Sequence, residues 1–89
     1  MKELTVKEND PKCTQAHNLI LWNDNYHDMI NVVVALSEVC HLTDKICITI
    51  MMEAHTKGRT VVKNGGIDDL LEMKKGLNRY GLIATVELA

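Results

Sequence analysis

The segment Leu19–Met29 constrains the fold of this chain more than any other part of the sequence. Four apolar residues suited to a strand, Leu19–Trp22, run directly into Asn23-Asp24-Asn25, and the apolar periodicity of a helix begins a few residues later. Asn and Asp end strands because their side chains hydrogen-bond to the neighbouring backbone. The segment therefore predicts a strand-to-helix corner at which several side-chain oxygens are directed to one place.

The polar residues at this corner could receive a cationic ligand. Asn23 offers a carbonyl oxygen and an amide, and Asp24 offers a carboxylate that only accepts hydrogen bonds. Such acceptors suit a positively charged group rich in N–H donors, and a free α-amino group is one. By themselves, these residues favour a capped corner without a ligand.

Length and charge limit the classes to which the chain can belong. Its 89 residues suffice for one small domain. A net charge of -2 lacks the basic excess of a nucleic-acid binder, so nucleic acid is not an expected partner. No apolar run reaches the length of a membrane span, and the first ten residues lack the apolar core of a signal peptide. We therefore expect no membrane partner and a cytoplasmic location.

The cysteines predict neither a disulfide framework nor a metal site. Cys13, Cys40 and Cys47 are an odd number in a chain without an export signal. There is no C-x2-C pair, and the spacings of Cys and His fit no zinc pattern. We expect Cys40 and Cys47 to be small buried apolar residues, with no metal and no cofactor.

Three stretches show the periodicity of helices. The first begins at Met29, with Asp28 as its N-cap or first residue, and its apolar residues recur at three- and four-residue steps. The second opens with Thr43 as N-cap and ends before Gly58; it is apolar nearly all round and is predicted to be the central helix, packed on more than one side. The third runs from about Asp68 and is stopped by Gly81.

Two further strands complete the predicted fold. Arg59–Lys63 reads as the second strand, followed by a turn at residues 64–66, and Leu82–Leu88 alternates as a closing strand. The order β-α-α-β-α-β predicts an α+β sandwich, in which a three-stranded antiparallel sheet packs against three helices. Residues 1–18 lack periodicity and are predicted to be a flexible N-terminal tail, and residues 19–89 to be the core domain.

Two motifs together resemble the ClpS family, the adaptors of the N-end rule and of Clp-dependent regulated proteolysis. The first is Leu-x-Asn-Asp-x-Tyr, from Leu21 to Tyr26, with Met29 three residues on at a helix start. The second is Met-x-x-x-His-x-x-Gly-Arg, from Met51 to Arg59, at the end of the next helix. The similarity runs from about Asn18 to the end of the chain, and the part after Gly66 resembles the shorter-helix variants of the family.

The resemblance implies a role for each matching position. The residues that would hold an α-amino group are Asn23, Asp24 and His55. The residues that would line the pocket for the first side chain are Met29, Val32, Met51, Ala54 and Leu82. The residues implied at the rim, or near the second residue of the ligand, are Asn25 and His27. The family usually has Thr-Pro before its helix Met, where this chain has His27-Asp28.

The function implied by the resemblance is adaptor and peptide binding rather than catalysis. A family member binds the free α-amino group and bulky first side chain (Leu, Phe, Tyr or Trp) of an N-degron substrate. It delivers that substrate to the N-terminal domain of a ClpA- or ClpC-type AAA+ ATPase. The residue types agree with this, because an ammonium needs converging acceptors and an apolar side chain needs a cavity.

Several alternatives remain open at the level of sequence. The residues fit a Clp-associated interaction module or inhibitor that does not deliver N-degrons. A purely structural module is a further alternative, since the fold of the family resembles the carboxy-terminal domain of the bacterial ribosomal stalk protein. Such a domain would not need the Asn-Asp corner or His55. An enzyme that uses His55 with Asp24 would need a nucleophile, and Cys47 is the candidate, two helical turns earlier. Met29 and Met51, taken alone, are typical of a helix core.

Overall fold

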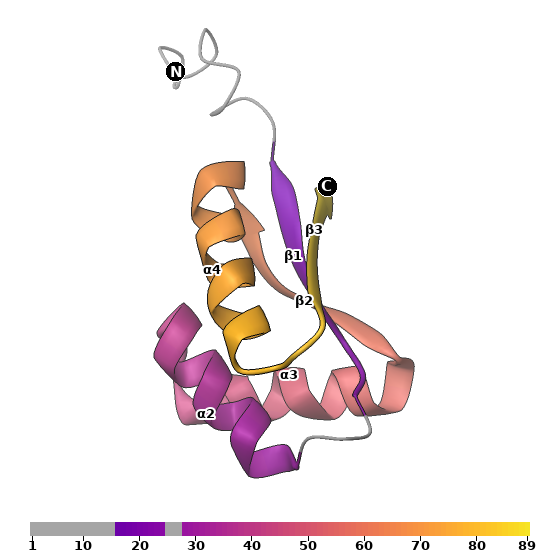
Figure 1. Cartoon of the computed structure of the whole chain (residues 1–89). Coiled ribbons are helices and arrows are strands. Elements are labelled where there is room, and N and C mark those ends of the chain that lie inside the picture. Colours follow the sequence, from indigo (N-terminus) through magenta and orange to yellow (C-terminus); the bar gives the residue numbers. More distant parts are fainter. Residues whose placement is uncertain (1–15, 25–27) are drawn as a thin grey trace, which may run out of the picture.

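The computed structural model describes residues 16–24 and 28–89, which form three strands and three helices in the predicted order (Figure 1). The elements are β1 (His17–Trp22), α2 (Met29–Cys40), α3 (Asp44–Lys57), β2 (Arg59–Gly65), α4 (Ile67–Arg79) and β3 (Ala84–Leu88). The α+β class and the antiparallel three-stranded sheet are confirmed.

β1 is the middle strand of the sheet, whose order is β2-β1-β3. Both neighbours run antiparallel to it, and its residues Leu19 and Leu21 are buried in the core. The register with β2 shifts between Leu19 and Ile20, so that one extra residue of β2, Val62, has no partner. Val62 is itself a core residue and lies between the exposed Val61 and Lys63.

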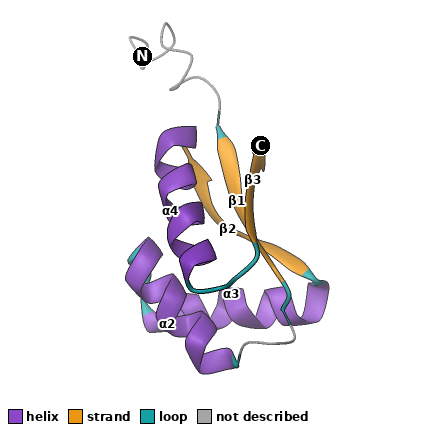
Figure 2. Cartoon of the chain, in the orientation of Figure 1, coloured by secondary structure: helices purple, strands orange, loops and turns teal. Residues whose placement is uncertain are grey.

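The helices form a layer in which α4 contacts all three strands and also α2. Figure 1 shows α4 alongside the sheet, with α2 and α3 together near the end at which β1 finishes. Colouring by secondary structure makes the separation of helices and strands visible (Figure 2). The element closest to a central helix is therefore α4.

The prediction that the second helix is central is wrong. α3 packs against α2 and β2, and its buried residues are Cys47, Ile50 and Ala54. Apolar side chains on its other sides remain 45–48% exposed, namely those of Ile46, Ile48 and Met52. The apolar side chains of a helix are buried only where another element packs against them. Within the described residues, other elements cover only part of the surface of α3.

The predicted helix ends are confirmed where local chemistry determines them. The Asp28 carboxylate is the N-cap of α2 and accepts from the backbone N–H of Asn31 at 2.8 Å. Thr43 caps α3, and Gly58 ends that helix with a φ of 91°. This left-handed conformation favours glycine, and the Gly58 N–H donates to the Ala54 carbonyl at 2.9 Å.

β1 and β2 extend beyond their predicted ends. β1 begins at His17, two residues earlier than predicted, and β2 continues through Asn64 and Gly65, which were expected in a turn. His17 pairs with both Gly65 and Leu88, and the Asn64 side-chain amide donates to the carbonyl of His17. Pairing with distant strands therefore holds these residues in the sheet. Of the predicted tail, residues 1–15 lie outside the described residues.

The closing strand begins at Ala84, two residues later than predicted. The Leu82 N–H donates to the Leu77 carbonyl at 3.1 Å, and the Asn78 amide donates to the Leu82 carbonyl at 3.0 Å. These bonds tie Leu82 to the end of α4 and remove its backbone groups from the ladder. Leu82 thus lies buried in the connection from α4 to β3.

The two cysteines within the described residues are free and buried, as predicted for Cys40 and Cys47; Cys13 lies outside those residues. In the same part of the chain, His, Cys, Asp and Glu form no group of three that could hold a metal ion. None of the described helices combines the length and the apolar character that crossing a membrane requires.

Candidate functional site

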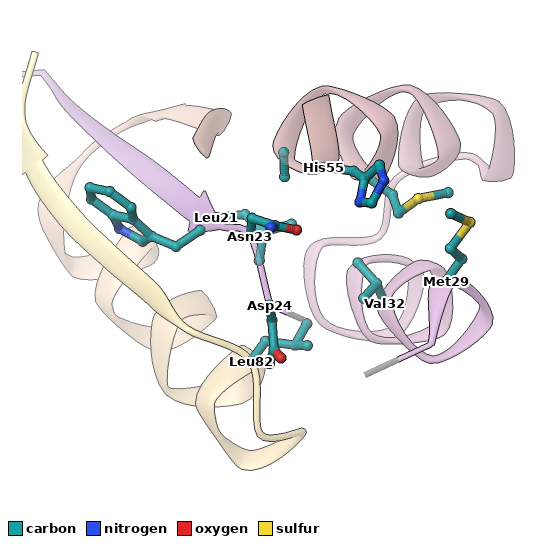
Figure 3. A pocket seen from close by; sticks show the side chains of 10 residues that line it. Leu21, Asn23, Asp24, Met29, Val32, His55 and Leu82 are labelled. Atoms are coloured by element: carbon teal, nitrogen blue, oxygen red, sulfur yellow. The ribbon is translucent and has the colours of Figure 1, made fainter. Parts of the chain in front are cut away.

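A small pocket lies where the end of β1 meets α2, α3 and the α4–β3 connection (Figure 3). Its volume is about 50 Å³. The residues that line it are Leu21, Trp22, Asn23, Asp24, Met29, Val32, Met51, Ala54, His55 and Leu82. Polar side chains from the corner and apolar side chains from the helices thus share one cavity.

Two backbone hydrogen bonds fix the corner after β1. The Trp22 N–H donates to the Ile83 carbonyl at 3.0 Å, and the Asn23 N–H donates to the Gly58 carbonyl at 2.8 Å. The second bond joins the corner to the residue that ends α3. Because His55 lies in the last turn of α3, this bond brings the corner beside the imidazole. Figure 3 shows the Asn23 side chain pointing across the pocket toward the side that carries His55.

The electrostatic character of the pocket favours a cation. Asn23 and Asp24 contribute side-chain oxygens, and a neutral His55 imidazole can accept through one ring nitrogen. The pocket also lies at the carboxyl end of α3, where the helix dipole places partial negative charge. The acceptor atoms, the Asp24 carboxylate and the carboxyl end of α3 therefore all favour a positively charged group in the pocket.

The apolar part of the pocket is built by three elements. Met29 and Val32 are one turn apart on α2, and Met51 is one turn before His55 on α3. Ala54 and Leu82 are buried, and the short side chain of Ala54 leaves room in the cavity. An apolar group of a ligand would contact aliphatic and thioether groups here.

The structure brings together all eight residues that the resemblance assigned to the site and that lie within the described residues. The two rim positions, Asn25 and His27, lie outside them. Leu21 and Trp22 also line the pocket, but the sequence analysis predicted them only as residues of the first strand, although Leu21 opens the first motif. The only signal that could have included them is their place immediately before the Asn-Asp corner.

Trp22 contacts groups outside the pocket as well. Its indole N–H donates to the Thr85 hydroxyl at 2.9 Å, and the Arg59 guanidinium carbon lies 5.1 Å from the ring centroid. This distance suits a cation–π contact. The contacts hold the indole of Trp22 in place at the strand end that leads into the corner.

Cys47, the nucleophile that the enzyme alternative requires, does not line this pocket. It is fully buried, and its thiol contacts the Leu42 carbonyl at 3.7 Å. Burial raises the pKa of the Cys47 thiol, and the nearby Asp44 carboxylate raises it further. The reactive thiolate is therefore disfavoured at Cys47.

Comparison with known proteins gives a consistent result. The family model described as ATP-dependent Clp protease adaptor protein ClpS matches residues 12–85. The ClpS adapter protein of Synechococcus elongatus is 33% identical over 86 residues, covering 96% of this chain and 87% of that protein. The ClpS adapter protein of Corynebacterium glutamicum is 33% identical over 70 residues, covering 79% of this chain and 70% of that protein.

A solved structure is similar in fold. The structure of Agrobacterium tumefaciens ClpS2 bound to L-phenylalaninamide matches with a TM-score of 0.81 and 26% sequence identity. The match covers 84% of this chain and 98% of that one. The likeness therefore extends over nearly the whole of the neighbour's fold.

Proposed function

The chain belongs to the ClpS family of Clp protease adaptors, and we propose that it binds the free α-amino group and bulky apolar first side chain of N-degron substrates. It then delivers them to a ClpA- or ClpC-type ATPase through the N-terminal domain of that ATPase. The cytoplasmic location expected from the sequence is part of this proposal. The observation that carries it is the pocket in which the Asn-Asp corner, His55 and an apolar lining meet.

The polar side of the pocket matches an amino terminus. An ammonium group has three N–H donors and no acceptor, so it needs several acceptors that converge. Asn23, Asp24 and His55 line the same pocket and can provide them. An acetylated amino terminus has lost its charge and two of these donors, and it would leave the acceptors of the pocket unmatched.

The apolar side of the pocket matches the first side chain. Burying a Leu or Phe side chain completely contributes roughly 1.5–3 kcal/mol. Several charge-assisted hydrogen bonds to the ammonium group add to this, and we expect affinity no tighter than micromolar. The cavity of about 50 Å³ is small for an aromatic ring, and the unbranched side chains of Met29 and Met51 are the ones able to rearrange around it.

The ligand of the structural neighbour supports this assignment. L-phenylalaninamide, to which the Agrobacterium tumefaciens protein is bound, carries a free α-amino group and a benzyl side chain. Its amide stands in for the peptide bond that follows the first residue of a polypeptide. The same combination of charge and apolar bulk is what the lining of this pocket suits.

A set of labelled peptides tests the proposal. The peptides differ only at the first residue, and binding is followed by fluorescence anisotropy. We expect micromolar binding for first residues Leu, Phe, Tyr and Trp, and none for Gly, Glu or Lys. Equal binding whatever the first residue would contradict the proposal.

Delivery requires a second measurement. A folded reporter that begins with Phe should be degraded by ClpA or ClpC with its protease faster when this protein is added. A reporter that begins with Gly is the control. If the Phe peptide binds but the reporter is not degraded faster, the part of the proposal that concerns delivery is refuted, and the protein is a binding module or an inhibitor.

A further inference from the structure

A second, wholly apolar hollow lies beside the pocket, between α2 and α3. Its volume is about 330 Å³. The residues that line this apolar groove are Met29, Ile30, Val33, Val34, Ile48 and Met51. No charged or polar side chain is among them.

The apolar groove is open to solvent. Ile30 is 74% exposed, and Val34 and Ile48 are close to half exposed. A single exposed apolar residue is ordinary, but a contiguous group around a hollow marks a binding surface. Of the three exposed apolar side chains of α3, that of Ile48 belongs to this groove.

The apolar groove is continuous with the pocket. Met29 and Met51 line both hollows, so their side chains form the partition between them. An extended polypeptide advances at most about 3.3–3.6 Å per residue. A chain whose first side chain fills the pocket therefore reaches past a partition of two side chains within one or two residues.

We propose that the apolar groove binds an apolar side chain at the second or third position of the same polypeptide whose amino terminus occupies the pocket. This inference rests on the proposed function. The ligand chemistry is set by the lining, which offers no partner for a charged or hydrogen-bonding side chain. The protein then reads a short apolar sequence rather than one residue.

A second copy of the chain fits the apolar groove less well. In a two-fold dimer the same surface patch contributes from both subunits, so a groove on the two-fold axis would face its own copy and stay unfilled. A convex side chain of a peptide fills a hollow directly. Because the groove continues the pocket, one peptide can occupy both, whereas a dimer makes no use of this continuity.

The test compares peptides that begin with Phe and have Gly-Gly, Leu-Gly, Gly-Leu or Glu-Gly at the next two positions. We expect a Leu at one of these positions to lower the Kd about five- to tenfold relative to Gly-Gly, because a Leu side chain becomes partly buried in the open groove. Glu should give no gain. The ratio of the Kd of the Gly-Gly peptide to the Kd of the better Leu peptide measures the use of the groove. Ile30→Ser and Ile48→Ser should each reduce this ratio toward one, since these residues line the groove and not the pocket.

Ile46→Ser is the matched control. Ile46 is a similarly exposed isoleucine of α3 that lies outside the lining of the groove, and this variant should keep the ratio. Equal Kd values for all four peptides would overturn the inference and leave the proposed function standing. Failure of every Phe peptide to bind would refute the proposed function itself. A dimer in sedimentation velocity that Ile30→Ser dissociates would assign the groove to a second copy instead.

Discussion

The role of the single residue His55 depends on which of its ring nitrogens carry protons. An imidazole that accepts a hydrogen bond from an ammonium must be neutral, whereas the protonated ring is a cation with donors only. A side chain at position 55 must therefore offer an acceptor if it is to hold an ammonium group in the pocket.

His55→Gln keeps a side-chain acceptor, so its Kd for a Phe-initiated peptide should stay within several-fold of the wild-type value. His55→Leu offers no acceptor, and it should weaken the binding at least about tenfold, because one hydrogen bond to a charged group is lost. Isothermal titration of both variants measures the two Kd values. An equal loss of affinity in His55→Gln and His55→Leu would contradict the acceptor role of His55.

Cys40 couples the stability of the fold to alkaline pH. Burial raises the pKa of its thiol from 9.0 to about 11, with Lys63 opposing the shift and Cys47 adding to it. The protonated thiol is the form that the folded state favours, so its contribution is complete below pH 9 and is lost as the pH rises toward 11.

The free energy of unfolding should therefore fall by on the order of 1 kcal/mol between about pH 8 and about pH 10 through this residue. Urea denaturation at both values gives the wild-type slope. Cys40→Ala lowers the stability at every pH because it leaves a cavity, but it should show a smaller fall with pH. An identical fall in both proteins would show that other groups cause it.

At the scale of elements, Gly76 sets how closely α4 approaches α2. A Cβ atom built at Gly76 would lie 2.7 Å from one γ-methyl carbon of Val39 and 3.1 Å from the other. The β-branched Val39 has one strongly preferred rotamer in a helix and cannot easily turn away. Glycine is thus required by helix packing, although it lowers the helix propensity of α4.

Gly76→Ala should destabilise the fold by about 1–3 kcal/mol, as overpacked cores do. Helix propensity alone predicts the opposite, a gain of about 1 kcal/mol. Thermal or urea denaturation distinguishes the two. In a Val39→Ala background the overlap is removed, so Gly76→Ala should there be neutral or stabilising. Stabilisation by Gly76→Ala in the wild-type background would contradict the close packing.

The elements also show what could be predicted from local sequence. The caps at Asp28, Thr43 and Gly58 were predictable because a cap depends on residues within one turn. The start of β1 was not, because His17 is placed by Gly65 and Leu88, which are far away in the chain. The start of β3 was not either, because the apolar alternation continues through Leu82 while the end of α4 binds its backbone groups. The exposed side of α3 was unpredictable for a related reason, since periodicity shows what is apolar and not what covers it.

At the scale of the whole molecule, the pocket exists only because segments distant in sequence meet. The corner after β1, the start of α2, the end of α3 and Leu82 all contribute. Periodicity alone would have assigned Met29 and Met51 to the core, and only the two motifs taken together predicted that these residues share a site. Leu21 and Trp22 were missed because an apolar strand residue carries no sign of a cavity other than its place beside the corner.

One titration tests most directly whether the protein recognises a free amino terminus. A peptide that begins with Phe is compared with its acetylated copy, using the wild-type protein, Asn23→Ala and Asn64→Ala. Asn64 is a matched control because it lies at the opposite end of the β1–β2 ladder and does not line the pocket. We expect the free peptide to bind wild type and Asn64→Ala with micromolar Kd, the acetylated copy to bind neither, and folded Asn23→Ala to bind neither peptide. Equal binding of the free and acetylated peptides would contradict the account.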